Sequence, residues 1–193
     1  MSPGAFDPLP QRGTSMNLFA SSPSPERSAR ALDDRRLLKM TVESAQLLST
    51  AMRERGLPAP YRPTHARPPV TRWTGRTQGN FRWVLRHLDA LALEYRRRFG
   101  RSHASARLSG QFWQALPRFP RGRRQPFVNL SNHPRVLPVT RAYRRRLNEK
   151  WRIDRGAARW TRSRPPRWAA RDLRASAMED AGRRARRAVL PRP

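Results

Sequence analysis

The chain has 193 residues, and 42 basic against 13 acidic residues give it a formal net charge of +29. This length allows one domain with tails, and a charge of this size favours polyanionic partners, above all nucleic acid. The lack of Cys excludes disulfides, thiolate nucleophiles and cysteine-ligated zinc, and it fits a cytoplasmic protein. No apolar run is long enough for a membrane-spanning helix, so we expect no membrane partner.

The basic residues are almost all arginines, because Lys39 and Lys150 are the only lysines of the chain. Such a ratio is expected from a GC-rich genome, so part of the charge reflects codon usage rather than binding. A lysine retained in this background indicates a task that Arg cannot perform, such as imine chemistry.

Composition divides the chain into three parts. Residues 1–15 are rich in Pro, Gly and Ser without a pattern, which predicts a disordered extension or a chain whose true start is Met16. Residues 16–168 carry the periodic apolar patterns and form the predicted domain. Residues 169–193 are dominated by Ala and Arg, which predicts a basic C-terminal tail.

The first predicted helix follows Ser24-Pro25-Glu26, which supplies an N-cap, a Pro at the first position and an acid in the first turn. It extends to Arg55, with a break near residues 32–34, and Gly56 ends it. Over residues 36–55 an apolar stripe lies opposite a polar one that places Lys39 and Glu43 one turn apart. As an exposed ion pair they would contribute only about 0.2–0.5 kcal/mol.

The central predicted helix covers residues 80–99, where apolar residues recur at three- and four-residue steps. Gly100 suits the left-handed position after its end. A second stripe carries mixed chemistry and either packs in the core or lines a pocket; it consists of Trp73, Asn80, Trp83, His87 and Glu94.

Two further helices are predicted, over residues 104–116 and 138–151. Residues 117–126 are expected to form a loop, and residues 127–130 a short extended segment without a partner strand. The sequence therefore predicts an all-α protein, a small helical domain with disordered basic termini.

The ordered motifs resemble a family of uncharacterised phage and bacterial proteins. The resemblance covers residues 16–168 and is carried by Asp33-Asp34-Arg35-Arg36, Lys39-Met40, Glu43, Gln46-Leu47-Leu48, Tyr61, Thr64-His65, Trp73, Asn80, Trp83, Glu94-Tyr95, Arg98-Phe99-Gly100 and His103. Arg67-Pro68-Pro69 departs from the family pattern, which has Asn-His-Pro there.

The layout is also similar to that of phage pyrimidine-dimer DNA glycosylases, small helical proteins that use an N-terminal amine and a helix-borne Glu. This second resemblance implies that Glu43, with Lys39 or a terminal amine, supplies the carboxylate and the amine of a glycosylase-lyase reaction.

Two functions stay open at this point. The first is nucleic-acid binding, with DNA favoured over RNA, through Arg-phosphate contacts and aromatic stacking. The alternative is a DNA-repair enzyme acting on damaged bases. The predicted catalytic residues are Glu43, Lys39 and Glu94, and the predicted nucleic-acid contacts are Arg36, Tyr61, His65, Trp73, Asn80, Trp83, His103 and Arg144.

We further predict that Glu43 faces a cleft shared with His65, Asn80, Trp83 and Glu94. No cofactor and no metal are predicted, although His65, Glu94 and His103 carry the donor types for a metal site should they converge. The sequence leaves the oligomeric state open.

Overall fold

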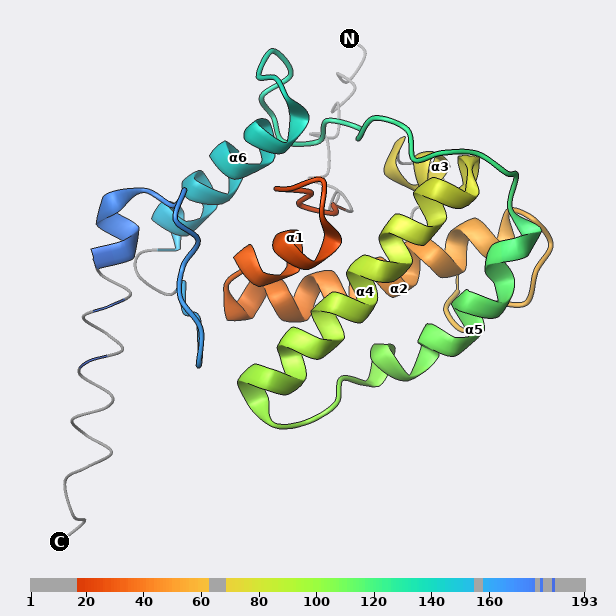
Figure 1. The fold of residues 1–193 in the computed structure, drawn as a ribbon, viewed down its shortest axis with the longest axis horizontal. Coiled ribbons are helices and arrows are strands. Elements are labelled where there is room, and N and C mark those ends of the chain that lie inside the picture. The colour runs from red at the N-terminus through yellow and green to blue at the C-terminus, as the bar shows by residue number, and fades with distance from the viewer. Residues whose placement is uncertain (1–16, 63–68, 155–157, 176–177, 179–181, 183–193) are drawn as a thin grey trace, which may run out of the picture.

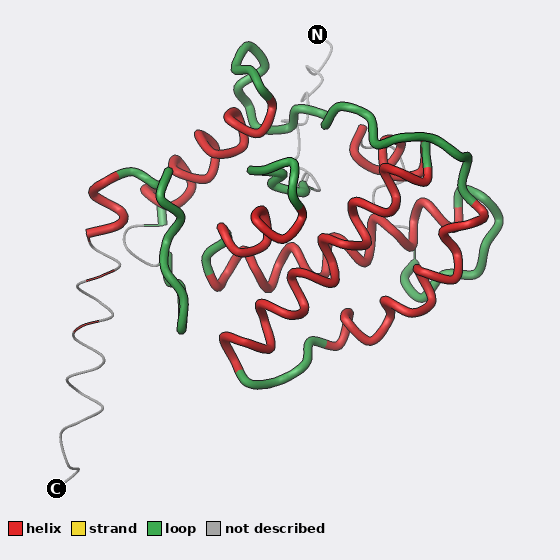
Figure 2. Tube along the Cα trace, viewed as in Figure 1, coloured by secondary structure: helices red, strands yellow, loops and turns green. Residues whose placement is uncertain are grey.

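The computed structural model describes residues 17–62, 69–154, 158–175, 178 and 182 (Figure 1). Figure 2 shows these residues as helices joined by loops, with no strand among them, which confirms the predicted all-α class. The elements in chain order are α1 (Pro25–Ala31), α2 (Asp34–Arg53), α3 (Pro69–Arg76), α4 (Gln78–Phe99), the 3-10 helix η1 (Ala104–Leu108), α5 (Ser109–Ala115), the 3-10 helix η2 (Leu116–Arg118) and α6 (Val139–Ile153).

Local sequence accounts for the division between α1 and α2. The Ser24 hydroxyl accepts the Arg27 backbone N–H at 3.2 Å and caps α1, as predicted. Leu32 and Asp33 are both extended, and they separate the two helices at the predicted break. Beyond the end of α2, Gly56 has a φ of 70°, which favours glycine.

The central helix α4 also has the predicted ends. The Thr77 hydroxyl accepts the Asn80 backbone N–H at 3.1 Å, and Gly100 lies in the left-handed region with a φ of 69°. Helix α3 was not predicted, because eight residues that begin at Pro69 are too few to establish a period.

Helix α4 forms the centre of the domain and packs against α1, α2 and α3 (Figure 1). Helices α2 and α4 pack against each other. The apolar stripe predicted for α2 is only partly the buried one, because Leu38 is 40% exposed while Met40 and Leu47, which the stripe did not include, are fully buried. The core that α2 and α4 share is made of fully buried side chains, among them Leu37, Met40, Leu47 and Leu48 of α2 and Phe81, Val84, Leu85, Leu88 and Leu91 of α4.

The loop after η2 crosses the N-terminus of α4 and satisfies its first backbone donors. The Gln78 N–H donates to the Pro120 carbonyl at 2.7 Å, and the Gly79 N–H donates to the Gly122 carbonyl at 3.0 Å. A Cβ at Gly79 would lie 2.2 Å from the Arg124 backbone nitrogen, so only glycine permits this approach.

Helix α6 is tied to the loop before it and to the start of α2. The Tyr143 hydroxyl donates to the Val128 carbonyl at 2.7 Å, and burial raises the pKa of Tyr143 to about 12. The Trp151 indole N–H donates to the Asp33 carboxylate at 2.8 Å. The predicted extended segment 127–130 is therefore a loop held by side chains rather than by a strand partner. No helix among the described residues is long and apolar enough to cross a membrane.

Candidate active site around Glu43

Glu43 holds a nearly buried carboxylate in the first half of α2, with 11% of its side chain exposed. Its Oε2 accepts the backbone N–H of Asn17 at 3.0 Å. Its Oε1 lies 3.4 Å from the Nζ of Lys39, whose side chain is 55% exposed. The Asn17 side chain donates to the Leu130 carbonyl at 3.3 Å, so the segment at the start of the described chain connects α2 to the loop before α6.

The charge of Lys39 acts on the second lysine of the chain, Lys150. Burial lowers the pKa of Lys150 on α6, and the charges of Arg146, Arg36 and Lys39 lower it further. The positive charge of Lys39 thus disfavours protonation of Lys150, although 111 positions of the sequence separate the two residues. Lys150 was not among the predicted site residues, and the rarity of lysine is the feature by which the sequence sets it apart.

Arg36 is held between two carboxylates that connect α2 to α6. The NH1 of Arg36 lies 3.0 Å from the Asp33 carboxylate, and its NH2 lies 2.7 Å from the Asp154 carboxylate. The residue is 8% exposed. Its predicted contact with nucleic acid would have to compete with both ion pairs, and the structure gives Arg36 a role in joining helices.

The aromatic and amide groups of the second stripe are buried in the domain. The Trp73 indole N–H donates to the Pro126 carbonyl at 2.7 Å, and the Trp83 indole N–H donates to the Pro23 carbonyl at 2.8 Å. Asn80 is fully buried and donates to the Trp73 carbonyl at 2.7 Å. In this conformation the two indoles pack edge to face against each other, with ring centroids 6.4 Å apart, rather than presenting a face to a base.

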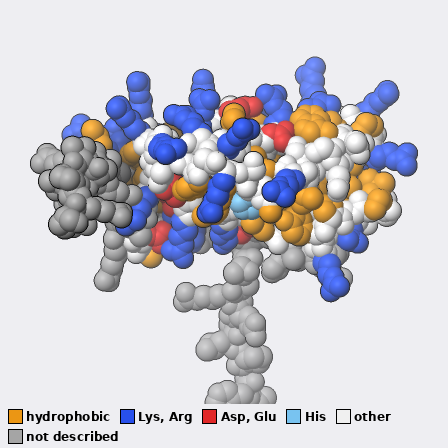
Figure 3. Space-filling model, turned by 90° about the horizontal axis from the view of Figure 1, so that it is seen from below, with side chains coloured by type: hydrophobic (Ala, Val, Ile, Leu, Met, Phe, Trp, Pro, Cys, Tyr) orange, Lys and Arg blue, Asp and Glu red, His pale blue; other side chains and the backbone are white. Residues whose placement is uncertain are grey.

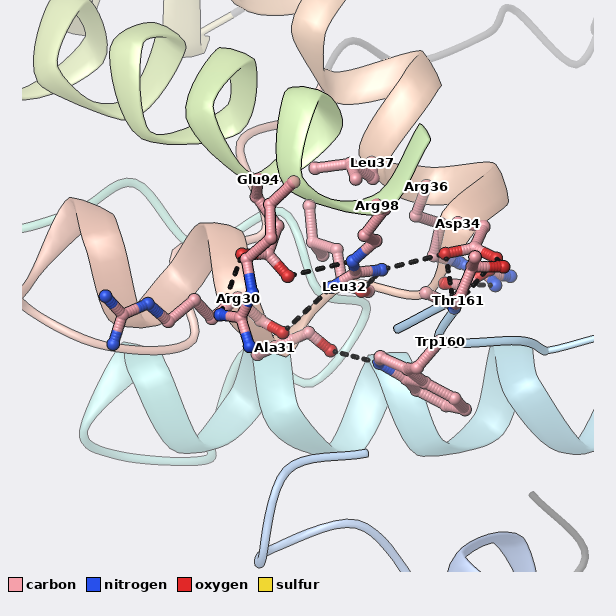
Figure 4. A network of polar contacts seen from close by, with 12 residues as sticks. Arg30, Ala31, Leu32, Asp34, Arg36, Leu37, Glu94, Arg98, Trp160 and Thr161 are labelled. Carbon is pink, nitrogen blue, oxygen red and sulfur yellow. Dashed lines mark hydrogen bonds and ion pairs between the residues drawn. The ribbon is translucent and has the colours of Figure 1, made fainter. Parts of the chain in front are cut away.

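Glu94 belongs to a buried ion-pair network at the C-terminal end of α4 (Figure 4). Its Oε1 accepts from the Arg98 Nε at 2.8 Å, and the Arg98 side chain has no exposed surface. The NH1 of Arg98 also donates to the Leu32 carbonyl at 2.8 Å and to the Asp34 carboxylate at 3.0 Å. Glu43 and Glu94 thus have different partners, and the contacts of Glu94 fasten α4 to the junction of α1 and α2.

The other predicted contact residues are spread over the domain. The Tyr61 hydroxyl bonds to the Ser105 hydroxyl at 3.0 Å, and the Nδ1 of His103 accepts the Ser105 backbone N–H at 3.1 Å and caps η1. Arg144 donates to the Ser21 carbonyl at 2.9 Å, and its guanidinium lies 5.6 Å from the ring centroid of Trp168. His65 lies outside the described residues.

The chemistry available at Glu43 combines a proton acceptor with a neighbouring amine. A carboxylate at this distance can take a proton from an ammonium group or from a substrate, and an amine that has lost its proton is a nucleophile. Within the described part of the chain, no three His, Asp or Glu side chains gather as metal ligands would.

A comparison with known families points to the same region. Residues 16–107 match the family model described as pyrimidine dimer DNA glycosylase. The match confirms the similarity to these glycosylases that the sequence predicted. It includes the segment at Asn17, Lys39 and Glu43, and it ends before α5, so Lys150 on α6 lies beyond it. No curated protein and no solved structure was found to match the chain.

Asn17 is the other residue that the sequence did not select for the site. It contacts Glu43 through its backbone N–H, which nearly every residue type has, so the identity of residue 17 does not indicate the contact. The available signal was positional, because Asn17 directly follows Met16, where the family resemblance begins.

Proposed function

We propose that the protein is a DNA glycosylase that acts on damaged pyrimidines through an amine nucleophile, with Glu43 as the proton-transferring carboxylate. The observation that carries the proposal is the position of Glu43 between the Lys39 amine at 3.4 Å and the Asn17 N–H at 3.0 Å. The family match over residues 16–107 supports the choice of DNA and of a damaged base as the substrate.

The reaction begins with attack of the amine nitrogen on C1′ of the damaged nucleotide, and Glu43 accepts the proton that the amine loses. The bond between C1′ and the base breaks, and the base leaves with the bonding electrons and takes up a proton. Opening of the sugar ring then gives an imine between C1′ and the amine. Loss of a proton from C2′ and departure of the 3′ phosphate oxygen cleave the strand by β-elimination.

Two amines can fill the role of nucleophile. Lys39 is the amine that the described structure places beside Glu43, and its exposure gives a substrate access to it. The second is the α-amine of a chain that starts at Met16, one residue before the Asn17 N–H that contacts Glu43. Met16 lies outside the described residues, so the assignment is left to experiment.

The proposal does not use Trp73 or Trp83 as stacking groups for the displaced base. Both indoles are buried and their N–H groups are bonded to backbone carbonyls. Exposing either of them would break an indole hydrogen bond and an aromatic contact, which is a large cost for binding one base.

Borohydride trapping on ultraviolet-irradiated DNA tests the proposal, because reduction of the imine joins protein and DNA covalently. We expect a trapped complex with the wild-type protein and a decrease of about 10²–10⁴-fold in its rate of formation with Glu43→Gln. The exposed carboxylate variant Asp172→Asn, which likewise exchanges a carboxylate for the amide of the same shape, is the matched control and should trap at the wild-type rate.

Mass mapping of the trapped peptide distinguishes the two amines. If Lys39 is the nucleophile, the adduct lies on residue 39 and Lys39→Arg, which keeps the charge, forms none. If the adduct maps to the first residue of a chain begun at Met16, the α-amine is the nucleophile. DNA binding without a trapped complex in any variant would contradict the glycosylase proposal and favour a protein that only binds DNA.

A further inference from the structure

A groove of about 690 Å³ lies between α1, the C-terminal end of α4 and residues 158–168, and Glu43 is not among the residues that line it. Its lining contains no acidic residue. Five arginines line it, together with Trp160 and Trp168: these are Arg27 and Arg30 of α1, Arg97 of α4, and Arg162 and Arg164 of the third wall.

Buried contacts hold the walls of this groove in place. The Trp160 indole N–H donates to the Ala31 carbonyl at 3.3 Å, and the Thr161 hydroxyl donates to the Asp34 carboxylate at 2.7 Å (Figure 4). The same carboxylate accepts from Arg98, which ties the C-terminal end of α4 to the start of α2. The third wall is therefore tied to both helices, and the arginines project from a preorganised frame.

The charge of the groove is largely uncompensated. Among the described residues, Arg27, Arg30, Arg162 and Arg164 form no ion pair, and all four are exposed; only Arg97 has an acidic neighbour, at 3.8 Å.

A second groove of about 740 Å³, on α6, provides a contrast. It contains Glu149, which forms ion pairs with Arg145 at 3.6 Å and with Arg146 at 3.4 Å, so part of its charge is neutralised. The first groove is thus the better site for an anion of high charge density.

We propose that the first groove binds the phosphate backbone of duplex DNA and is a contact surface additional to the Glu43 site. The choice of DNA rests on the proposed function. Guanidinium groups bind phosphate oxygens in a bidentate manner, and several of them along one groove suit a linear array of phosphates better than a single anion. Trp168, which is half-buried and lines the groove, adds apolar surface for the sugars.

Residues 158–168 lie beyond the family match, which ends at residue 107. The third wall of the groove, with Arg162, Arg164 and both tryptophans, therefore comes from a part of the chain that the family model does not cover. It would extend the DNA contact of this protein past the region that carries Glu43.

The experiment must separate this groove from the general charge of the surface. Figure 3 shows Lys and Arg side chains distributed over a whole face of the molecule, so any loss of arginines weakens binding to some extent. The groove variant is Arg27→Gln/Arg162→Gln/Arg164→Gln. The control variant, Arg107→Gln/Arg118→Gln/Arg121→Gln, removes the same charge from exposed arginines of η1, η2 and the loop after η2.

Affinity for a short undamaged DNA duplex is measured at several salt concentrations for the full chain and both variants. Each lost phosphate contact lowers the slope of log K against log salt by about 0.9, so three contacts lower it by about 2.7. Between about 50 mM and 200 mM salt, the groove variant should lose about fortyfold less affinity than the wild type. The control variant should keep a slope near that of the wild type.

If the slope of log K against log salt were equal for the two variants, the groove would not be a specific contact surface, and DNA binding would depend on the net charge alone. An effect on an RNA duplex without one on DNA would overturn the choice of DNA. The outcome is independent of the glycosylase proposal, because trapping can fail while the slope falls as expected, and the slope can stay unchanged while trapping succeeds. Thermal unfolding of both variants checks that each is folded.

Discussion

His87 on α4 is a fully buried imidazole, and its stability effect can be worked out from its surroundings. Neither ring nitrogen has a hydrogen-bond partner within the described structure, and the ring lies 5.1 Å from that of Trp83. Burial lowers the pKa of His87 from 6.5 to about 3, against a smaller opposing effect of the Glu26 carboxylate. The imidazole is therefore neutral in the folded protein at physiological pH.

The sign of the pH effect follows from which state binds the proton. Between the folded pKa of about 3 and the unfolded pKa of 6.5, the unfolded chain protonates His87 and the folded chain does not. Stability contributed by the neutral imidazole is thus present above pH 6.5 and is lost as the pH falls toward 3. At about pH 4.5, two units below the unfolded value, the loss is about 2.7 kcal/mol, at about 1.36 kcal/mol per unit.

The perturbation that isolates this effect is His87→Leu, a change to an apolar side chain of similar volume. At about pH 7.5 the variant should differ from the wild type by less than about 1.5 kcal/mol, because it replaces an imidazole that has no partner. Urea unfolding at about pH 7.5 and about pH 4.5 gives the free energies of both proteins. Carboxylates titrate in both proteins alike, so the difference between the two proteins reports His87.

We expect that difference to shift by about 2.7 kcal/mol in favour of His87→Leu on going to the lower pH. The control His103→Asn, at a partly exposed imidazole that caps η1, tests whether any His produces the shift. A difference that is the same at both pH values would refute the reasoning, because the folded protein would then bind the proton as readily as the unfolded chain does.

Three further predictions concern stability. Glu43→Gln keeps an acceptor for the Asn17 N–H and removes the charge that pairs with Lys39, whose side chain is 55% exposed. Urea unfolding should therefore show a change below about 1 kcal/mol, whereas a larger loss would indicate a structural carboxylate. Gly79→Ala should cost about 1–3 kcal/mol because its methyl group would meet backbone at 2.2 Å, while Gly110→Ala, in open space, should cost nothing. Arg98→Met should lower the free energy of unfolding by about 3–5 kcal/mol, because it leaves the buried Glu94 carboxylate without its buried cation. The control is Arg97→Met, whose side chain is 58% exposed, and an equal loss of stability in that variant would contradict this account.

Helices α4 and α6 were predictable because each buries one broad face, and a buried face gives apolar residues a period of about 3.6 in the sequence. Helix α2 was predicted by the same pattern, but it is buried almost all round from residue 40 to residue 52, so the pattern located the helix better than its faces. Helix ends were predictable where one residue type decides them, as at Ser24 before α1 and Gly100 after α4. Helix α3 is too short for a period, and its position depends on the contact between the Trp73 indole and the Pro126 carbonyl, 53 residues away. Periodicity carries no information about such a partner.

The second stripe of α4 shows the same limit for the site. Its spacing places Asn80, Trp83 and Glu94 near one line, but their chemistry is decided by partners elsewhere in the chain. Asn80 and Trp83 are occupied by backbone carbonyls, and Glu94 is occupied by Arg98. A polar residue that satisfies a buried network and one that lines a pocket look alike in sequence.

The ion pairs Lys39–Glu43 on α2 and Glu94–Arg98 on α4 have the same spacing of four residues, but they differ in how deeply the cation is buried. Glu94 is bonded to Arg98, whose side chain has no exposed surface and also donates to two backbone carbonyls and to Asp34. Removing that cation from its place would break every one of these contacts, so the pair is fixed. Glu43 faces Lys39, whose side chain is 55% exposed and can exchange the carboxylate for a substrate at little cost. The same motif is therefore structural on α4 and open to chemistry on α2, which is why the proposed reaction uses Glu43 and leaves Glu94 in the framework.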